Sequence, residues 1–189
     1  MRICYLLNGF GFTGGSIVVY NIMNKLCENG YEVYAVTPHT RVKWEVGKEK
    51  DILESNRGIS KKNIKKNIKQ MIVSNKLANS IYKMIKERDG DQDRYLLENR
   101  NIIKNWIECD YTIATLFTTA YAAYELSDYT IPLYHMQHYE ELFVTDNPHI
   151  QKVARASYGL PINLISNSSW LKSEIEHRFN RKTYLLNPA

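Results

Sequence analysis

The sequence has few cysteines and no long apolar run, and both absences narrow the class of protein. Its 189 residues include only Cys4, Cys27 and Cys109, whose spacing matches no metal-binding or redox motif. We therefore interpret them as reduced thiols of a cytoplasmic protein. No apolar run approaches the roughly 20 residues that a membrane-spanning helix needs. Met1 leads directly into an apolar run, so we also expect no signal peptide.

The sequence also lacks the most recognisable arrangements of catalytic residues. It contains no Ser-His-Asp constellation and no cluster of His, Cys, Asp or Glu at metal-ligand spacing. His135 and His138 lie three residues apart in an expected strand, so their side chains should face opposite sides of it. We therefore predict no metal and no cofactor.

Length and composition are typical of a globular domain with a real core. Hydrophobic residues make up 44% of the chain, and its length favours one domain over two. The net charge of +5 weakly favours anionic partners. The chain ends at Ala189, directly after an expected buried strand. From this we expect it to be one half of a larger protein.

The first third of the chain has the pattern of a βαβ unit. A strand, a glycine-rich turn, a helix and a second strand are expected at Arg2–Asn8, Gly9–Gly15, Ser16–Asn29 and Tyr31–Thr37. Ser16 is the expected N-cap of the helix, and Gly30 stands where a glycine commonly ends a helix. Such units imply a parallel sheet.

The rest of the chain extends this unit into a larger sheet. Further strands are expected at Tyr111–Phe117, Leu133–Gln137, Ile162–Ile165 and Thr183–Leu186, helices at Tyr95–Ile107 and Thr118–Leu126, and a turn at Asp89–Asp93. Six strands interleaved with helices predict an α/β fold, a Rossmann-like doubly wound parallel sheet over residues 1–189. Residues 40–105 are expected to form a helical insertion. In such sheets the ligand lies beyond the carboxyl ends of the strands.

The glycine turn matches the dinucleotide-binding fingerprint only in part. Gly9-Phe-Gly-Phe-Thr-Gly14 follows a strand and precedes a helix, as G-x-G-x-x-G does in those proteins. The fingerprint also requires an acid about 20 residues further on, where this chain has Thr37-Pro38-His39. Nicotinamide binding is therefore not expected. Gly14 and Gly15 still predict phosphate binding at a helix N-terminus, and the alternative is a flexible connection.

A strongly basic segment occupies the middle of the chain. Residues 57–69 include six basic residues and no acid, and isoleucines recur at helical spacing as far as residue 86. One interpretation is a helix that rests on an anionic membrane surface. The other is a helical insertion whose apolar stripe packs on the domain while its lysines are solvated. No aromatic residue interleaves with the lysines, so nucleic acid is not expected as a partner.

Several motifs together resemble one enzyme family. They are the pair Gly14-Gly15 at a helix start, Gln137-His-Tyr-Glu140 followed by Phe143, Tyr158-Gly-Leu-Pro161, and Asn167-Ser-Ser-Trp-Leu171. In this order they resemble the N-terminal half of a GT-B glycosyltransferase, and most of all the retaining family 4 enzymes similar to bacterial rhamnosyltransferases. The likeness covers nearly the whole chain apart from Thr40–Asn105. His138 departs from the pattern, which has Asp after the Gln.

The resemblance implies a function for a longer protein. The N-terminal domain of such enzymes binds the acceptor, while the C-terminal domain holds most of the nucleotide-sugar site and would be absent from this chain. The whole enzyme would move a sugar to a glycan or lipid-linked acceptor in cell-surface polysaccharide biosynthesis. It would be cytoplasmic, either free or peripheral at the inner membrane face. The isolated chain would be inactive. The alternatives are a non-catalytic Rossmann-like domain that binds a nucleotide or a protein, and half of a nucleotide-sugar epimerase.

The resemblance and the expected strand ends together select the candidate site residues. Gln137 and His138 are the catalytic candidates, and we expect only one of them to face the cleft. Gly14, Gly15 and Ser16 are the candidates for donor phosphates. Candidates for the acceptor or a sugar are Asn8, Thr118, Glu140, Ser166 and Asn167. Three simpler roles stay open: a structural hydrogen bond for His138, a helix cap for Glu140 or Glu141, and a helix cap for Asn167 or Ser168.

Overall fold

The computed structural model describes residues 1–11, 13–56, 90–144 and 147–187. The basic segment at 57–86 therefore lies outside the described residues. The elements are β1 (Arg2–Leu6), α1 (Gly14–Glu28), β2 (Glu32–Val36), β3 (Arg41–Lys43), α2 (Lys48–Asn56), α4 (Gly90–Asn105), β4 (Tyr111–Ala114), α5 (Phe117–Glu125), β5 (Ile131–Met136), the 3-10 helix η3 (Glu140–Leu142), α6 (Pro148–Ser157), β6 (Asn163–Ser166), α7 (Ser169–Phe179) and β7 (Thr183–Leu185).

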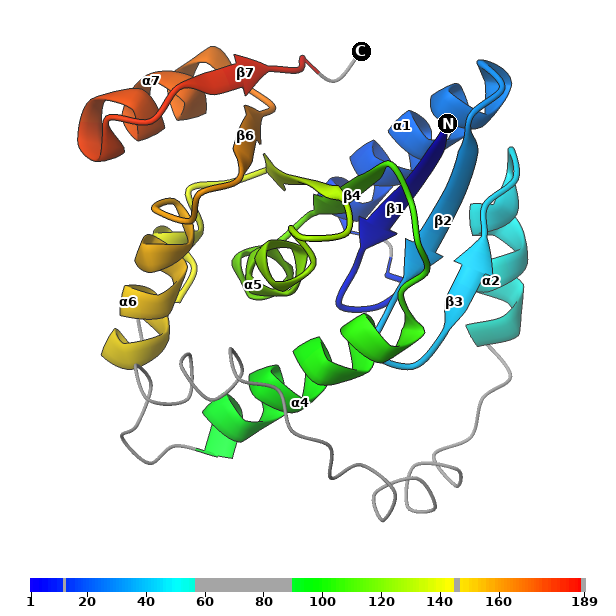
Figure 1. Cartoon of the computed structure of the whole chain (residues 1–189), viewed down its shortest axis with the longest axis horizontal. Helices are drawn as coiled ribbons and strands as arrows, with labels where there is room; N and C mark the ends of the chain where they lie inside the picture. Colours follow the sequence, from blue (N-terminus) through cyan, green and yellow to red (C-terminus); the bar gives the residue numbers. More distant parts are fainter. Residues whose placement is uncertain (12, 57–89, 145–146, 188–189) are drawn as a thin grey trace.

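The strands of the described residues form one sheet in the order β3-β2-β1-β4-β5-β6-β7 (Figure 1). Every neighbouring pair is parallel except β2 and β3, which run antiparallel. The predicted α/β fold with a Rossmann-like, mostly parallel sheet is thus confirmed. The strand β3 was not predicted. Its three residues follow a tight turn in which Thr37 N–H donates to Thr40 O at 2.8 Å. A run of three residues is too short to show the alternating hydrophobic pattern of a strand.

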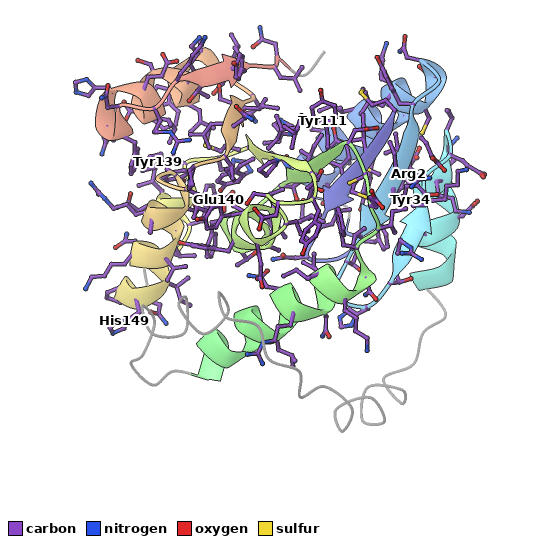
Figure 2. The ribbon with its side chains drawn as sticks, in the orientation of Figure 1. Arg2, Tyr34, Tyr111, Tyr139, Glu140 and His149 are labelled. Carbon is purple, nitrogen blue, oxygen red and sulfur yellow. The ribbon has the colours of Figure 1, made fainter. Side chains whose placement is uncertain are left out.

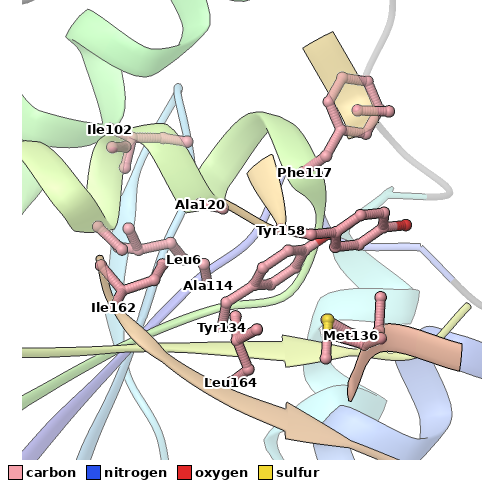
Figure 3. Packing of buried hydrophobic residues seen from close by; sticks show 14 of the residues in the cluster. Leu6, Ile102, Ala114, Phe117, Ala120, Tyr134, Met136, Tyr158, Ile162 and Leu164 are labelled. Carbon is pink, nitrogen blue, oxygen red and sulfur yellow. The ribbon is translucent and has the colours of Figure 1, made fainter. Parts of the chain in front are cut away.

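Both faces of the sheet are covered by helices. Side chains along β1 alternate: Ile3 and Tyr5 pack with α1 and α2, whereas Cys4 and Leu6 pack with the layer formed by α4, α5, α6 and α7. Figure 3 shows the centre of this second layer, where the rings of Tyr134 and Tyr158 stack at a centroid distance of 6.2 Å. Strands buried on both faces explain why the sequence shows compact apolar runs rather than alternation.

Helix α1 begins earlier than the sequence predicted. Its N-cap is Thr13, whose Oγ1 accepts a hydrogen bond from Ser16 N–H at 3.3 Å, so the helix starts at Gly14 and the expected N-cap role of Ser16 is wrong. The other end is as predicted. Gly30 adopts a left-handed φ of 81°, and its N–H donates to Cys27 O at 2.9 Å.

Helix α4 also begins earlier than predicted. It includes residues 90–93, which were expected to form a turn, and it ends at Asn105. Ile102 on this helix is fully buried in the second layer. The polar composition of residues 90–93 masked the helix start in the sequence, because Gly and Asp are weak helix formers.

No helix in the described part of the chain is long and apolar enough to cross a membrane. All three cysteines are free thiols, as predicted, with Cys4 and Cys109 buried and Cys27 partly buried.

Replacing Gly30 by Ala tests the helix end. The left-handed backbone at φ 81° disfavours any Cβ, so Gly30→Ala should lower the free energy of unfolding by about 1 kcal/mol. Gly9→Ala is the matched control, because Gly9 has no left-handed φ and no atom within 4 Å of an added Cβ. Urea denaturation measures both. Equal effects of the two substitutions would contradict the left-handed assignment.

Candidate functional site

A cleft lies at the carboxyl end of the sheet, where the helices change faces. Strand β1 leads to α1 on one face, whereas the neighbouring strand β4 leads to α5 on the other. Loops that leave adjacent strands toward opposite faces open a crevice between them. The cleft has a volume of about 640 Å³. It is lined by Leu7, Asn8, Gly9, Phe10, Gly11, Thr13, Gly15, Ser16, Val19, Tyr20, Thr115, Leu116, Phe117, Gln137, His138, Glu140, Phe143 and Val144.

A second hollow, of about 620 Å³, lies at the opposite edge of the sheet. Three of its charged residues are already paired with one another: Arg2 Nε is 3.0 Å from Glu32 Oε2, and the backbone N–H of Arg2 donates to Asp110 Oδ2 at 2.6 Å. The cleft at the carboxyl edge is therefore the better candidate site, since parallel sheets place their ligands there.

The structure brings six of the ten predicted site residues together. Asn8, Gly15, Ser16, Gln137, His138 and Glu140 line the cleft. Gly14, Thr118, Ser166 and Asn167 do not line it. Thr118 and Asn167 instead bind residues of the cleft: Thr118 Oγ1 donates to Asn8 Oδ1 at 3.0 Å, and Asn167 Nδ2 donates to Gln137 O at 2.8 Å. Ser166 is fully buried.

The glycine-rich loop reaches the cleft through the N-terminus of α1. The first N–H groups of any helix have no partner within it, and Thr13 Oγ1 accepts only that of Ser16. The Thr13 and Ser16 hydroxyl oxygens lie 3.0 Å apart. Tyr20 fixes the loop from one turn further along α1, since its Oη donates to Gly11 O and accepts from Gly11 N–H at 3.0 and 3.2 Å. This end of α1 therefore presents N–H and hydroxyl donors in a fixed loop.

Gly15 allows Gln137 to approach the helix. A Cβ on Gly15 would lie 2.7 Å from Gln137 Oε1, closer than non-bonded atoms come. The oxygen itself is buried and has no hydrogen-bond partner among the described residues. A larger residue at position 15 would therefore have to displace the end of the Gln137 side chain, which gives this glycine a packing role beside that of a flexible connection.

Gln137 and His138 both line the cleft, contrary to the expectation that only one would face it. Strand β5 ends at Met136, so the alternation of side chains along a strand does not extend to these two residues. His138 is exposed, and its ring lies 4.9 Å from that of Phe143, which is 70% exposed at the same rim. His135 is buried on the strand itself, so the two histidines do lie in different surroundings.

Glu140 is buried beneath the cleft and binds helix α5. Glu140 is labelled in Figure 2, beside α5. Its Oε2 accepts from Phe117 N–H at 2.6 Å and its Oε1 accepts from Tyr134 Oη at 2.8 Å. Burial raises the pKa of Glu140 to about 7, because these two bonds do not offset the loss of solvent. The predicted alternative of a helix cap is met, but for α5 rather than for the helix that follows. Glu141 instead binds Tyr139 and Arg155.

The capping alternative also holds at α7. Ser168 is the N-cap, and its Oγ accepts from Leu171 N–H at 3.2 Å. Asn167 is not the cap. Its side-chain amide donates to Gln137 O instead and so links the loop after β6 to the loop after β5.

The described lining of the cleft carries almost no charge. It contains no lysine or arginine, and its one acid, Glu140, is only 4% exposed. No group of three His, Cys, Asp or Glu among the described residues could hold a metal ion. The site therefore offers hydrogen bonds, aromatic surface and helix N–H groups.

Three of the lining residues that were not site candidates are informative. Thr13 had a usable signal, since a threonine three residues before Ser16 is a common N-cap arrangement. Phe143 was noted within a motif but not as a lining residue. Tyr20 had no signal, because its bond to Gly11 depends on how the loop folds back.

No protein-family model matches this sequence, and a search among curated proteins finds no match.

The close contact between Gly15 and Gln137 predicts energetic coupling. Gly15→Ala should displace the Gln137 carboxamide, whereas in a Gln137→Ala background the same change should only favour the helix. The coupling in the free energy of unfolding should be about 1 kcal/mol, measured by urea denaturation. Gly14→Ala is the matched control, because no atom lies within 4 Å of its added Cβ. Additive effects of Gly15→Ala and Gln137→Ala would contradict the contact.

Two buried groups predict opposing effects of pH on stability. Burial raises the pKa of Glu140 from 4.5 to about 7. The free energy of unfolding should therefore fall as pH rises from 4.5 to 7, because the folded protein holds this proton more tightly than the unfolded chain does. Burial lowers the pKa of His135 from 6.5 to about 4, so the free energy of unfolding should fall as pH falls from 6.5 to 4. Each effect amounts to about 3 kcal/mol at 1.36 kcal/mol per pKa unit.

Between pH 4.5 and 6.5 the two effects should largely cancel in the wild type. The stability of Glu140→Gln should rise with pH in this range, and that of His135→Leu should fall. Chemical denaturation at a series of pH values measures the slopes. Parallel pH profiles for both variants would show that neither group is titrating as described.

Proposed function

We propose that this chain is the acceptor-side half of a nucleotide-sugar-dependent glycosyltransferase of the GT-B type. One observation carries the proposal. A single cleft at the carboxyl edge of a Rossmann-like sheet gathers the glycine-rich helix start and the residues Gln137, His138 and Glu140. These residues belong to separate motifs that resemble family 4 glycosyltransferases, and in the folded chain they line the same cleft.

The chemistry of the cleft supports the acceptor side. Sugars are neutral, offer hydroxyls for hydrogen bonding and have one apolar face. The cleft provides amide groups at Asn8 and Gln137, and the exposed ring of Phe143 stands at its rim. In the proposed reaction Phe143 packs against the acceptor ring, while Gln137 and His138 hydrogen-bond to the hydroxyl that receives the sugar.

The glycine-rich helix start supports a contact with the donor. Glycosyl transfer builds negative charge on the leaving diphosphate, and N–H groups at a helix N-terminus stabilise such charge. Gly14, Gly15 and Ser16 take this role in the proposal. Basic residues for the remaining charge would come from a second domain, because the described cleft lining has none.

A binding experiment tests the proposal on this chain. With half of the donor site elsewhere, UDP-glucose, GDP-mannose or dTDP-glucose should bind in the millimolar range, worth about 4 kcal/mol. In ¹⁵N-labelled protein the amide signals of Gly14, Gly15 and Ser16 should shift on titration. Gly15→Val should abolish these shifts by filling the space beside the helix start.

Ligand controls separate phosphate contact from other binding. Inorganic diphosphate should shift the same three amides, whereas uridine, which has no phosphate, should leave them in place. Micromolar affinity would indicate a complete nucleotide site in this chain and would exclude the division of the site proposed here. Shifts confined to the opposite hollow around Arg2 and Asp110 would exclude this cleft.

A further inference from the structure

Glu140 binds three separate elements from one buried position. Its carboxylate oxygens accept from Phe117 N–H at the start of α5 and from Tyr134 Oη on β5, at 2.6 and 2.8 Å. Its own N–H donates to Tyr158 Oη, at the end of α6, at 2.6 Å. With 4% of its surface exposed, Glu140 is held by protein contacts on nearly every side.

Helix α5 lacks a polar N-cap of its own. Leu116 occupies that position, and its side chain has no acceptor. The hydroxyl of Thr119, in the first turn, accepts from Thr115 N–H and Leu116 N–H at 3.1 Å each, and so serves the residues before the helix. Glu140 supplies an acceptor to Phe117 N–H from a distant part of the chain, and its negative charge suits the helix N-terminus.

The two segments that Glu140 joins are both walls of the cleft. One is the loop 115–117, which precedes and begins α5. The other is the segment 137–143, which carries Gln137, His138 and Phe143 to the rim. Within this segment Phe143 N–H donates to Glu140 O at 3.0 Å, so the position of the rim follows that of Glu140.

We propose that Glu140 is a positioning residue, whose carboxylate joins α5 to the segment 137–143 and thereby sets the shape of the cleft. It does not contact the ligand. The sequence had suggested contact with the acceptor, but both carboxylate oxygens are bonded within the fold.

The hydrogen bonds of the joint are strongest when Glu140 is ionised. The carboxylate then accepts from both donors in charge-assisted bonds. In the protonated form the carboxyl donates its own proton, so the bond with Tyr134 Oη must reverse and the bond from Phe117 N–H is no longer charge-assisted. The titratable groups that face it are the phenols of Tyr134 and Tyr158, while Glu141 binds Tyr139 and Arg155 instead. Since burial raises the pKa of Glu140 to about 7, these hydrogen bonds are stronger above this pH and weaker below it, although burying the charge lowers the stability of the whole fold as the group ionises.

The consequence for substrates rests on the proposed function, because an acceptor would meet the rim that Glu140 positions. The inference about the shape of the cleft needs no ligand. Its failure would leave nucleotide-sugar binding at Gly14–Ser16 untouched, and a lack of nucleotide-sugar binding would leave the joint intact.

The experiment follows the cleft by NMR between pH 5 and 9 without any ligand. In the wild type, the amide signals of Phe117, Gln137 and Phe143 should shift with one common midpoint. In Glu140→Gln this transition should disappear, and the three signals should stay near their low-pH positions. His138 is present in both proteins, so the difference between their pH profiles reports Glu140.

Three variants separate positioning from capping alone. Glu141→Gln is the matched control and should keep the transition, because Glu141 binds other partners. Glu140→Asp keeps the charge but is too short for both bonds, so Gln137 and Phe143 should shift as in Glu140→Gln. Tyr134→Phe removes one bond and should move the same signals. If only the Phe117 signal responds in these variants, Glu140 caps α5 and positions nothing, and the inference fails.

Discussion

The structure depends most on the parallel pairing of β1 with β4, in register from Ile3–Tyr111 to Leu6–Ala114. From this pair the chain continues toward opposite edges of the sheet, to β2 on one side and to β5 on the other. Because crossovers between parallel strands are right-handed, opposite directions place the following helices on opposite faces. The loops after β1 and β4 must therefore diverge, and the cleft is the space between them. A change that shifted this register would move both walls of the cleft at once.

The second constraint is the buried polar group beside this pair. Burying a carboxyl group costs free energy unless it is hydrogen-bonded, and Glu140 is bonded to α5, β5 and the end of α6 together. The surrounding aromatic rings exclude water, with Tyr139 and Tyr158 stacked at 5.5 Å. Low polarity strengthens each of these bonds and raises the cost of losing any one. The same burial therefore strengthens the hydrogen bonds of Glu140 and raises the pKa of its carboxyl group.

Much of the fold was predictable from local patterns, and the errors have physical causes. The apolar runs identified six strands, because strands buried on both faces are continuous in sequence, whereas β3 has three residues and no such run. Thr13 is the N-cap in place of Ser16, because its hydroxyl accepts a hydrogen bond from Ser16 N–H and the helix therefore starts at Gly14. The strand ends also predicted two of the segments that meet at the cleft, 8–16 and 137–141, but wrongly included Ser166 and Asn167 and missed the loop 115–117. The partners of Glu140 were not predictable, since Phe117 and Tyr158 lie far from it in sequence and only the packed structure brings them together.

Charge decides what this cleft holds well by itself. A phosphate group carries about −1.5 to −2 at pH 7, whereas a helix N-terminus offers roughly +0.5. The described cleft lining adds no lysine or arginine, so most of a diphosphate's charge would stay unneutralised there. A neutral, hydroxyl-bearing ring needs no such charge, and the lining offers it amides, hydroxyls and the exposed Phe143 ring. For the proposed reaction this favours the uncharged partner as the occupant of the cleft, with the helix start of α1 contacting only the edge of the charged one.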